Sequence, residues 1–532
     1  MTSIIVMTFQ QSDYSFQALV DDIEEERIRW NIPGMAISVV GPKINGHRNV
    51  YEHAFGVKQI DSTSSSNNID LDTVFHIGSD TKLITSFAVA MLVDQRQLQW
   101  TQPIKEYWKD FKLIDSFAEN NANLIDLLSH RIGVPRADFL MEICLNSTEM
   151  RGRISHLQPV EQFRDSFIYN NHFLALAGEI VGRKANLHPN FIESWALFLE
   201  ENIFKRIGLE NSYATIEHFL HHSQNFAVSH YTDLFKDMKP NPLPVDENLI
   251  VDRVAPAGSV SMSIRDRAKW LTFLLDKGQL ADGTYLLSPE AFDQIFTPHN
   301  IVKTSPSYSL STYGLSNWIS TYKGHSVISH GGIMYGQYST TCFFPDLDFG
   351  VVALTTGIQL GSDDLCFDVV DRLFFKSTTS LGHIQATYQS RMDEQIWMIN
   401  ENQRQIDSRQ PYAPPSLNYS SYCGVYVNQV FGKLKMDCDT DSDAAFVIRI
   451  MDAPSKYALN LPVFHFEYDR FVPLLDNESK VLAPVNGNVT FSIESNIVVT
   501  VLFQLSLPAA NMYPFTDGYP EGILFNRLEF SD

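Results

Sequence analysis

The sequence predicts an α/β fold: a sandwich in which the first and last helices cover an antiparallel sheet, a helical lobe, and then a small all-β barrel domain. Three observations predict it. Strand-like runs occur early and again between residues 313 and 356, helical periodicity fills most of residues 82–278, and short alternating runs follow residue 415. A chain of 532 residues, 44% of them hydrophobic, is long enough to bury the cores of two domains.

The elements of the first domain follow from local patterns. A helix is expected in FQALVDDIEEERIRW, and the two apolar runs after it flank Asn45-Gly46, which favours a tight turn between antiparallel strands. In the middle, apolar residues recur every three or four positions, as in FIESWALFLEENIFKRIG, so helices are expected. Strands return in HSVISHGG, YSTTCFFP and DFGVVALTT, with a turn at residues 345–348. The polar-faced segment 364–410 predicts one long helix.

A proline-rich stretch divides the chain. Three prolines within residues 411–415 fix the backbone and remove hydrogen-bond donors, so this stretch is expected to be a linker. Residues 1–410 form the expected first domain and residues 416–532 the second. In the second, alternating runs such as YCGVYVNQV, AFVIRIM and IVVTVLFQL are typical of an antiparallel barrel or sandwich.

The charge argues against nucleic acid and anionic membranes as partners. The formal net charge is -22, and no basic helix or Lys/Arg block offsets it locally. The first residues carry no basic leader, and no run approaches the roughly 18 apolar residues of a membrane span, so a cytoplasmic location is expected.

The cysteines are widely spread without a C-x-x-C pair, so buried free thiols are expected at Cys144, Cys342, Cys366, Cys423 and Cys438.

The search for catalytic residues starts at Ser79, at the turn between a strand-like run and a long helix. Lys82 lies one helical turn further, on the same face. A serine nucleophile needs such a base nearby, and burial would lower the pKa of the lysine. The alternative is an ordinary helix N-cap. The same spacing recurs at Ser320 and Lys323, but a strand would point those two side chains to opposite faces, so geometry favours Ser79.

Two further motifs accompany this pair. Tyr169 and Asn171 precede an apolar helix, and His330 is followed by Gly331 and Gly332 at the end of a strand-like run. Each also has a structural interpretation. The tyrosine and asparagine fit a loop aromatic and a helix cap, and the histidine and glycines fit a strand end with a bend.

Together and in this order, the three motifs resemble the serine β-lactamase and penicillin-binding-protein superfamily. The Tyr-x-Asn form resembles its class C-like branch, which holds β-lactamase-related esterases, D-aminopeptidases and LACTB-like proteins. Stretches such as LIDLLSHRIGVPRADF and APAGSVSMSIRDRAKWLTFLL are similar as well, so that the resemblance spans about residues 15–400. Residues 416–532 resemble the lipocalin-like modules that follow this domain in some of these hydrolases.

The resemblance implies a role for each polar side chain. Ser79 would be acylated, and Lys82 would assist proton transfer. Tyr169 would act as the base toward Ser79 and later toward water, although the sequence leaves open whether Tyr169 or Lys82 holds the proton. Asn171 would hold the substrate and Lys82. His330 occupies the place of a lysine in the third motif, where it would contact the substrate.

The resemblance also implies an oxyanion hole. The backbone N–H groups of Ser79 and Ile333 would form it, while Gly331 and Gly332 keep the strand edge open to the substrate. A histidine in the third motif is mostly neutral above its ordinary pKa of about 6.5, so it anchors anions less well than lysine. This departure favours small uncharged acyl substrates over β-lactams.

The sequence therefore predicts a serine hydrolase acting through an acyl-enzyme, an esterase or amidase on a small-molecule substrate. D-amino-acid peptidase, β-lactamase and acyltransferase activities stay open as alternatives, as does a catalytically idle scaffold or binding protein. No cofactor and no metal are expected, and no nucleotide-binding loop is present. A histidine cluster fits a solvated helix face better than a metal site: His218, His221 and His222. The oligomeric state stays open.

Overall fold

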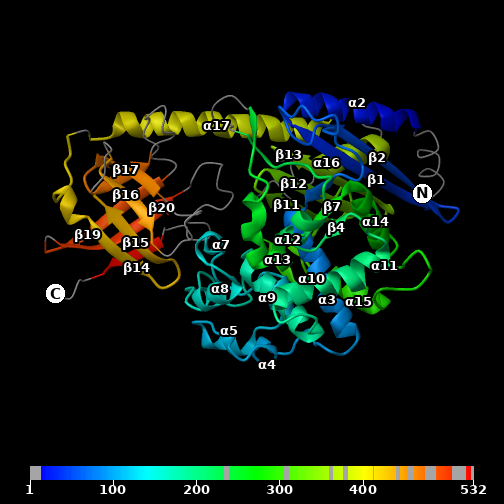
Figure 1. Cartoon of the computed structure of the whole chain (residues 1–532), viewed down its shortest axis with the longest axis horizontal. Coiled ribbons are helices and arrows are strands. Elements are labelled where there is room, and N and C mark those ends of the chain that lie inside the picture. The colour runs from blue at the N-terminus through cyan, green and yellow to red at the C-terminus, as the bar shows by residue number, and fades with distance from the viewer. Residues whose placement is uncertain are drawn as a thin grey trace.

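The structure is a computed structural model that describes residues 13–232, 239–302, 311–358, 364–375, 381–410, 412–438, 444–451, 460–473, 487–495, 497–505 and 523–528. It consists of an α/β body and a β-barrel, and helix α17 (Gly382–Ser408) runs along both (Figure 1). The predicted fold class is confirmed. Of the predicted linker, residue 411 lies outside the described ranges.

An eight-stranded antiparallel sheet forms the centre of the body, in the order β2-β1-β13-β12-β11-β10-β9-β8. Asn45 and Gly46 connect the first two strands, so the predicted hairpin is confirmed. The predicted turn at residues 345–348 separates β12 from β13. The strands are β1 Gly34–Ile44, β2 His47–Gly56, β8 Asn300–Val302, β9 Ser311–Tyr313, β10 Trp318–Tyr322, β11 His325–Met334, β12 Gln337–Phe344 and β13 Phe349–Thr356.

Both faces of the sheet are covered, because alternate side chains of β1 are buried in two different cores. Met35, Ile37 and Val39 pack in the core that includes α2 (Asp13–Arg29) and α16 (Asp364–Leu373). Ala36 and Val40, which point to the other face, belong to the core of the helical lobe. The expected single helix over 364–410 is wrong, because α16 ends at Leu373 and α17 begins at Gly382.

The helical lobe lies on the other face of the sheet. Its helices are α3 Thr81–Asp94, α4 Ile104–Tyr107, α5 Ser116–Asn121, α6 Leu124–Leu128, α7 Leu140–Ile143, α8 Ser147–Ile154, α9 Asn171–Ala185, α10 Phe191–Leu199, α11 Lys205–Ile207, α12 Ile216–His222, α13 Ala255–Gly258, α14 Ile264–Leu275 and α15 Pro289–Ile295. The body also contains two small sheets: β3 Val74–His76 with β4 Ser212–Tyr213 and β7 Ser261–Ser263, and β5 His230–Thr232 with β6 Pro240–Pro242. Among the described residues, no helix is both long and apolar enough to cross a membrane.

The C-terminal region forms a closed eight-stranded barrel in which sequence neighbours pair and β21 closes on β14. Its strands are β14 Gly424–Asn428, β15 Gly432–Asp437, β16 Phe446–Ile450, β17 Asn460–Glu467, β18 Arg470–Pro473, β19 Gly487–Glu494, β20 Ile497–Leu505 and β21 Ile523–Arg527.

Aromatic side chains fill the barrel. The rings of Phe446 and Phe471 lie 4.5 Å apart, and those of Tyr422 and Phe491 lie 4.9 Å apart. Tyr422, Phe446 and Phe471 are inaccessible to solvent. An eight-stranded barrel is just wide enough for such a packed core or for one small ligand, so this packing indicates a structural barrel. The lipocalin-like resemblance stays a prediction.

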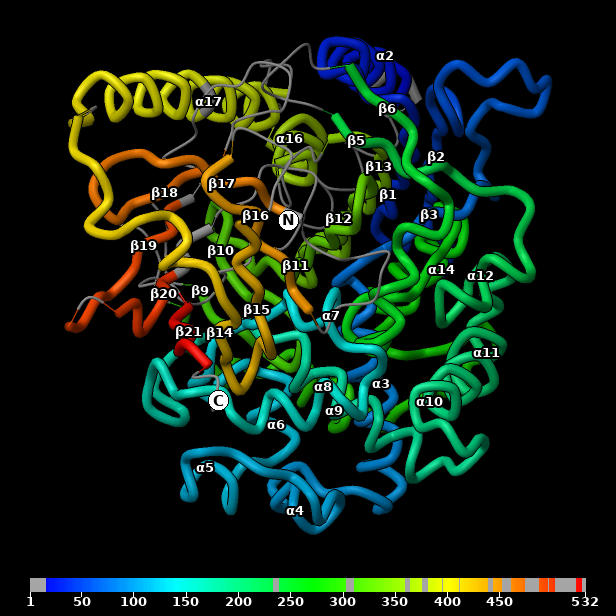
Figure 2. The backbone as a smooth tube through the Cα atoms, turned by 60° about the vertical axis from the view of Figure 1, so that its left-hand side comes forward, coloured from blue at the N-terminus to red at the C-terminus, as the bar shows by residue number. Residues whose placement is uncertain are grey.

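Among the described residues, two hydrogen bonds from arginine side chains join the barrel to helices of the body. The turn between β14 and β15 lies beside α8 in both views (Figures 1 and 2), and Arg153 of α8 donates to Val430 O at 3.2 Å. At the other place, Arg470 donates to Gln405 of α17 at 2.9 Å. A backbone oxygen of the barrel thus contacts α8, and a barrel side chain contacts α17.

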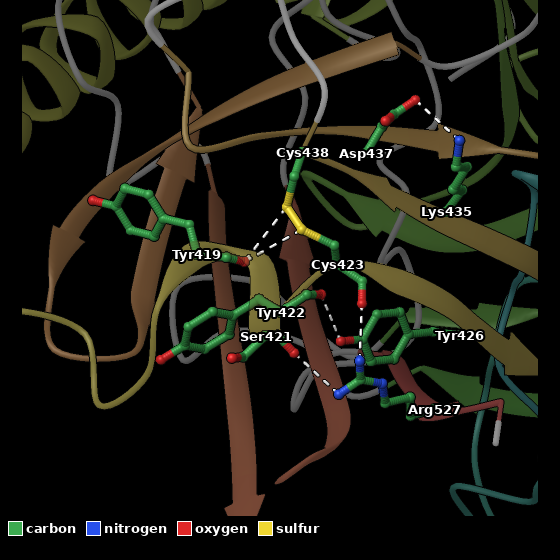
Figure 3. Close-up of a disulfide and its surroundings, with 9 residues drawn as sticks. All are labelled: Tyr419, Ser421, Tyr422, Cys423, Tyr426, Lys435, Asp437, Cys438 and Arg527. Carbon is green, nitrogen blue, oxygen red and sulfur yellow. Dashed lines mark hydrogen bonds and ion pairs between the residues drawn. A yellow bond between two sulfur atoms is a disulfide. The ribbon is translucent and has the colours of Figure 1, made fainter. Parts of the chain in front are cut away.

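Four of the five cysteines form disulfides, so the expectation of free thiols was wrong for them. Cys342 of β12 pairs with Cys366 of α16, their Cα atoms 6.1 Å apart. Cys423 and Cys438 pair across the β14–β15 hairpin (Figure 3) with Cα atoms 5.9 Å apart, within the range that a disulfide requires. Only Cys144 is free and buried. Disulfides are rare in cytosolic proteins, so the paired cysteines do not support the expected cytoplasmic location.

Candidate active site

Ser79 lies in a short 3-10 turn, η1 (Gly78–Asp80), between β3 and α3. It is half-buried. The helix-cap interpretation is wrong, because Asp80 stands at the N-cap of α3 and no side chain caps it. The Ser79 hydroxyl instead bonds two side chains: Lys82 Nζ and the Tyr169 hydroxyl each lie 2.8 Å from Ser79 Oγ. The structure therefore brings together three of the predicted residues.

A buried ion pair holds the turn that carries Ser79. Arg267 of α14 donates to Asp80 at 2.6 Å, and both side chains are at most 3% exposed. Ser339 of β12 donates to the same carboxylate at 2.7 Å and lies 2.6 Å from Ile77 O. Two elements distant in sequence, α14 and β12, thus hold the turn that carries the nucleophile.

Lys82 is inaccessible to solvent. Its Nζ bonds Ala257 O of α13 at 2.6 Å in addition to Ser79. Burial lowers the pKa of Lys82 well below 10.5, although the Asp138 and Asp80 carboxylates oppose the shift. The second Ser-x-x-Lys copy forms no comparable group, because Lys323 pairs with Asp371 at 2.5 Å.

Tyr169 contacts Ser79, Lys82 and Arg136. Lys82 Nζ lies 4.8 Å from the centre of its ring, and Arg136 Cζ lies 5.0 Å from it. Burial raises the pKa of the Tyr169 phenol above its ordinary value of 10.0, while the hydrogen bond to Ser79 and the Arg136 charge oppose the shift. Burial therefore favours the neutral phenol.

Asn171 is the first residue of α9, whose N-cap is Asn170. Asn171 Nδ2 donates to Asp138 Oδ1 at 2.9 Å. Its Oδ1 is buried and has no hydrogen-bond partner among the described residues. The expected contact between Asn171 and Lys82 is thus not a hydrogen bond in this structure.

His330 lies on β11 and is 4% exposed. Its Nε2 lies 3.0 Å from the Tyr313 hydroxyl, and its ring centre lies 6.4 Å from that of Tyr169. Burial is the largest cause that lowers the pKa of His330, to about 3. The imidazole is therefore neutral near pH 7 and carries no charge for an anionic substrate group.

Gly78 and Gly332 allow β11 to pack closely against η1, the turn that carries Ser79. A Cβ on Gly332 would lie 1.8 Å from Ile77 O, and one on Gly78 would lie 2.8 Å from Ile333 N. Only a residue without a side chain fits at either position. This close approach brings the Ile333 backbone beside the turn of Ser79, where the oxyanion hole was predicted; Gly331 lies half-buried between His330 and Gly332.

Three residues of the loop between α6 and α7 surround Tyr169 and were not singled out from the sequence. The His130 ring lies 4.4 Å from the Tyr169 ring, and Arg136 forms an ion pair with the fully buried Asp138. His130 has a φ of 56°, which is uncommon for a residue other than glycine. Only the stretch LIDLLSHRIGVPRADF as a whole pointed to this loop.

The histidine cluster on α12 is not uniformly solvated. His218 is half-buried and bonds Glu193 Oε1 at 2.8 Å and Glu200 Oε1 at 2.9 Å, so the expected solvated face was wrong for it. The hydrogen bond to Glu200 raises the pKa of His218 to about 9. Within the described ranges, no group of three or more His, Cys, Asp or Glu side chains is arranged to hold a metal ion.

Comparisons with known proteins identify a family and several relatives. A family model described as Beta-lactamase matches residues 18–369. The chain is 24% identical over 465 residues to the unguisins hydrolase ungD' of Aspergillus campestris, covering 84% of this chain and 82% of that protein. It is 25% identical over 336 residues to penicillin-binding protein 4 of Amycolatopsis lactamdurans, covering 62% of this chain and 82% of that protein.

A solved structure is similar over nearly the whole chain. The octameric penicillin-binding protein homologue from Pyrococcus abyssi superposes with a TM-score of 0.56 at 17% identity, covering 94% of this chain and 99% of that chain. At this identity the likeness shows the fold.

Proposed function

This chain belongs to the Beta-lactamase family, and from that premise we propose that it is a serine hydrolase that forms an acyl-enzyme on Ser79. One observation carries the proposal: Lys82 Nζ and the Tyr169 hydroxyl both lie 2.8 Å from Ser79 Oγ. A nucleophile with two proton-transfer groups in hydrogen-bond reach is the arrangement that acyl transfer needs. A scaffold protein has no physical requirement for it.

The directions of the Lys82 and Tyr169 pKa shifts support a role for each group. Burial favours a neutral amine on Lys82 and a neutral phenol on Tyr169. Ser79 Oγ attacks the substrate carbonyl carbon while its proton passes to Lys82 Nζ, which makes Lys82 the base. The Ser79 and Ile333 N–H groups stabilise the oxyanion. The Tyr169 phenol gives its proton to the leaving group and recovers one from Lys82. Water then attacks the acyl carbon while a water proton passes to Lys82 Nζ, and Ser79 Oγ leaves with that proton as the acid is released.

The site supports an esterase or amidase on a small uncharged acyl group. The neutral His330 supplies no cation at the place where a lysine would hold a carboxylate. Hydrolysis is favoured over acyl transfer by the relative named as a hydrolase, which covers most of this chain. D-amino-acid peptidase and β-lactamase activities are the alternatives.

The pH dependence of kcat/KM should report the titration of Lys82 on the acid side and of Tyr169 on the alkaline side. Protonated Lys82 cannot accept the Ser79 proton, so kcat/KM should fall as the pH falls through the Lys82 pKa, which lies well below 10.5. The alkaline decline should begin only above pH 10, because burial raises the Tyr169 pKa. A pH–rate profile of p-nitrophenyl acetate hydrolysis, corrected for spontaneous hydrolysis, checks this. An acid limb that vanishes in His330→Gln would place the titrating base on His330 instead.

Intact-protein mass spectrometry tests the proposed function. The protein is exposed to a panel of p-nitrophenyl esters, a D-amino-acid p-nitroanilide and a β-lactam, quenched in acid, and digested. We expect a mass gain equal to one acyl group, located on the peptide that contains Ser79. An acyl group found on another residue, with Ser79 unmodified during turnover, would contradict the proposal.

A further inference from the structure

None of the five cysteines presents an exposed free thiol. Cys342 and Cys366 are paired and fully buried, Cys423 is paired with Cys438, and the unpaired Cys144 is buried. Disulfides form and persist in secretory and extracellular compartments and are rare in the cytosol. The pairing of every cysteine that solvent can reach therefore favours folding in an oxidising compartment.

In a secretory compartment, the motif Asn-x-Ser/Thr, in which x is not proline, is the acceptor for N-linked glycans. The motif occurs at four asparagines of this chain: Asn146, Asn418, Asn477 and Asn488. A glycan is bulky and hydrated, so the asparagine that carries it must project into solvent in the folded protein. Exposure and hydrogen bonding therefore decide which of these motifs can carry a glycan.

Asn146 meets this condition in the loop between α7 and α8. Its side chain is exposed, and so is Thr148, which completes the motif. Asn146 is also the N-cap residue of α8, where its Oδ1 accepts from Glu149 N at 3.0 Å. A glycan bonds to Nδ2 and leaves Oδ1 able to accept, so the helix cap is compatible with the modification.

Asn418 meets the same condition at the start of the barrel. Asn418 and Ser420, the two ends of its motif, are both exposed. Asn418 precedes the short 3-10 turn η4 (Tyr419–Ser421), and its side chain makes no capping hydrogen bond there. The neighbouring Tyr419 lies beside the disulfide of the barrel (Figure 3). A glycan at this position would displace no capping contact.

The other two motifs lack this support. Asn488 of β19 is half-buried, and its Oδ1 accepts from Arg470. Arg470 also donates to Gln405 of α17, so a glycan on Asn488 would lie beside a contact between the barrel and the body. Asn477 lies outside the described residues.

We propose that Asn146 and Asn418 carry N-linked glycans, added while the chain passes through an oxidising secretory compartment. In the transfer, the asparagine Nδ2 attacks the anomeric carbon of an oligosaccharide that is linked to a lipid pyrophosphate. A C–N bond replaces the anomeric C–O bond, Nδ2 loses one proton, and the lipid pyrophosphate leaves with the electron pair of the broken bond. The modification does not involve Ser79, so it is tested separately from the proposed function.

Peptide mass spectrometry of the full-length protein, produced in its natural host, tests the proposal. The protein is treated with peptide N-glycosidase in heavy-oxygen water, which converts a glycosylated asparagine into an aspartate that contains heavy oxygen. A parallel incubation without the glycosidase corrects for spontaneous deamidation. We expect heavy-oxygen aspartate at positions 146 and 418. Without reduction, the same digest should contain the peptide of Cys342 joined to that of Cys366, and the peptide of Cys423 joined to that of Cys438.

Substitutions at the third residue of each motif assign the glycans without changing the acceptor asparagine. Thr148→Ala and Ser420→Ala should each lower the intact mass by one glycan, and the double variant should lose both. Thr148→Ser and Ser420→Thr are the matched controls, because either hydroxyl residue completes the motif. Both control variants should keep both glycans.

Each position is judged by its own result. An unmodified Asn146 or Asn418 in the wild-type protein would overturn the proposal for that residue, whether or not the disulfides form. A glycan that persists in Thr148→Ala or Ser420→Ala would overturn the assignment to that motif. The wild-type measurement decides the proposal even where a variant does not fold. Acylation of Ser79 is unaffected by any of these outcomes.

Discussion

Ser79→Ala should lower kcat for ester hydrolysis by about 10⁴- to 10⁶-fold, because no other described hydroxyl lies between Lys82 and Tyr169 as a nucleophile. Lys82→Met should cost a comparable factor. The double variant should be little worse than either single one, since the two side chains act as one unit. Steady-state hydrolysis of p-nitrophenyl acetate measures all three.

Ser320→Ala is the matched control, because it removes a serine from the second Ser-x-x-Lys copy, on β10. Its lysine partner is engaged by Asp371, so wild-type rates are expected. If Ser79→Ala hydrolysed esters at the wild-type rate, with tryptic mapping confirming the substitution, the acyl-enzyme mechanism would be refuted.

Arg267→Met should lower the free energy of unfolding of the α/β body by about 3–5 kcal/mol, the cost of leaving a buried charge without its partner. Arg267 and Asp80 are 1% and 3% exposed. Burial already raises the pKa of Asp80, and the Arg267 charge is what opposes that shift. Without it, Asp80 must stay charged away from solvent with only hydroxyl donors, or take up a proton. Urea denaturation followed by tryptophan fluorescence measures the loss.

Arg265→Met is the control for Arg267→Met, because both arginines lie on α14 and each forms an ion pair. Arg265 is 42% exposed and pairs with Asp72, which is 47% exposed, so solvent screens the interaction. Its loss should cost about 1 kcal/mol or less. Equal stability of the two variants would show that the buried pair does not hold the Ser79 turn. The double variant Asp80→Leu with Arg267→Met should recover part of the stability, because no unpaired charge remains.

The local elements of the fold could be predicted from the sequence because short-range patterns specify them. The Asn45-Gly46 turn, the helix after Ser79 and the alternating strands of the barrel all depend on neighbouring residues. The Ser79–Lys82 pairing follows from one turn of helix. Placing Tyr169 beside them needed the resemblance to a family, because the two sites are 90 residues apart.

Long-range pairings could not be predicted in this way. The disulfides join cysteines 24 and 15 residues apart, and no spacing rule connects them. Asp80 and Arg267 are 187 residues apart, and either one alone resembles an ordinary surface charge. The contacts of His130 and Asp138 with the tyrosine motif arise only when the loop between α6 and α7 packs against α9.

The sequence by itself determined the order of helices and strands, the barrel and which side chains could do chemistry, because these depend on residue type and short spacing. The tertiary structure decided which of those side chains meet. It also decided the direction of their pKa shifts: burial lowers the pKa of Lys82 and of His330 and raises the pKa of Tyr169. Burial is a property of packing between distant segments, and the free energy of a charge depends on that packing rather than on its neighbours in the chain.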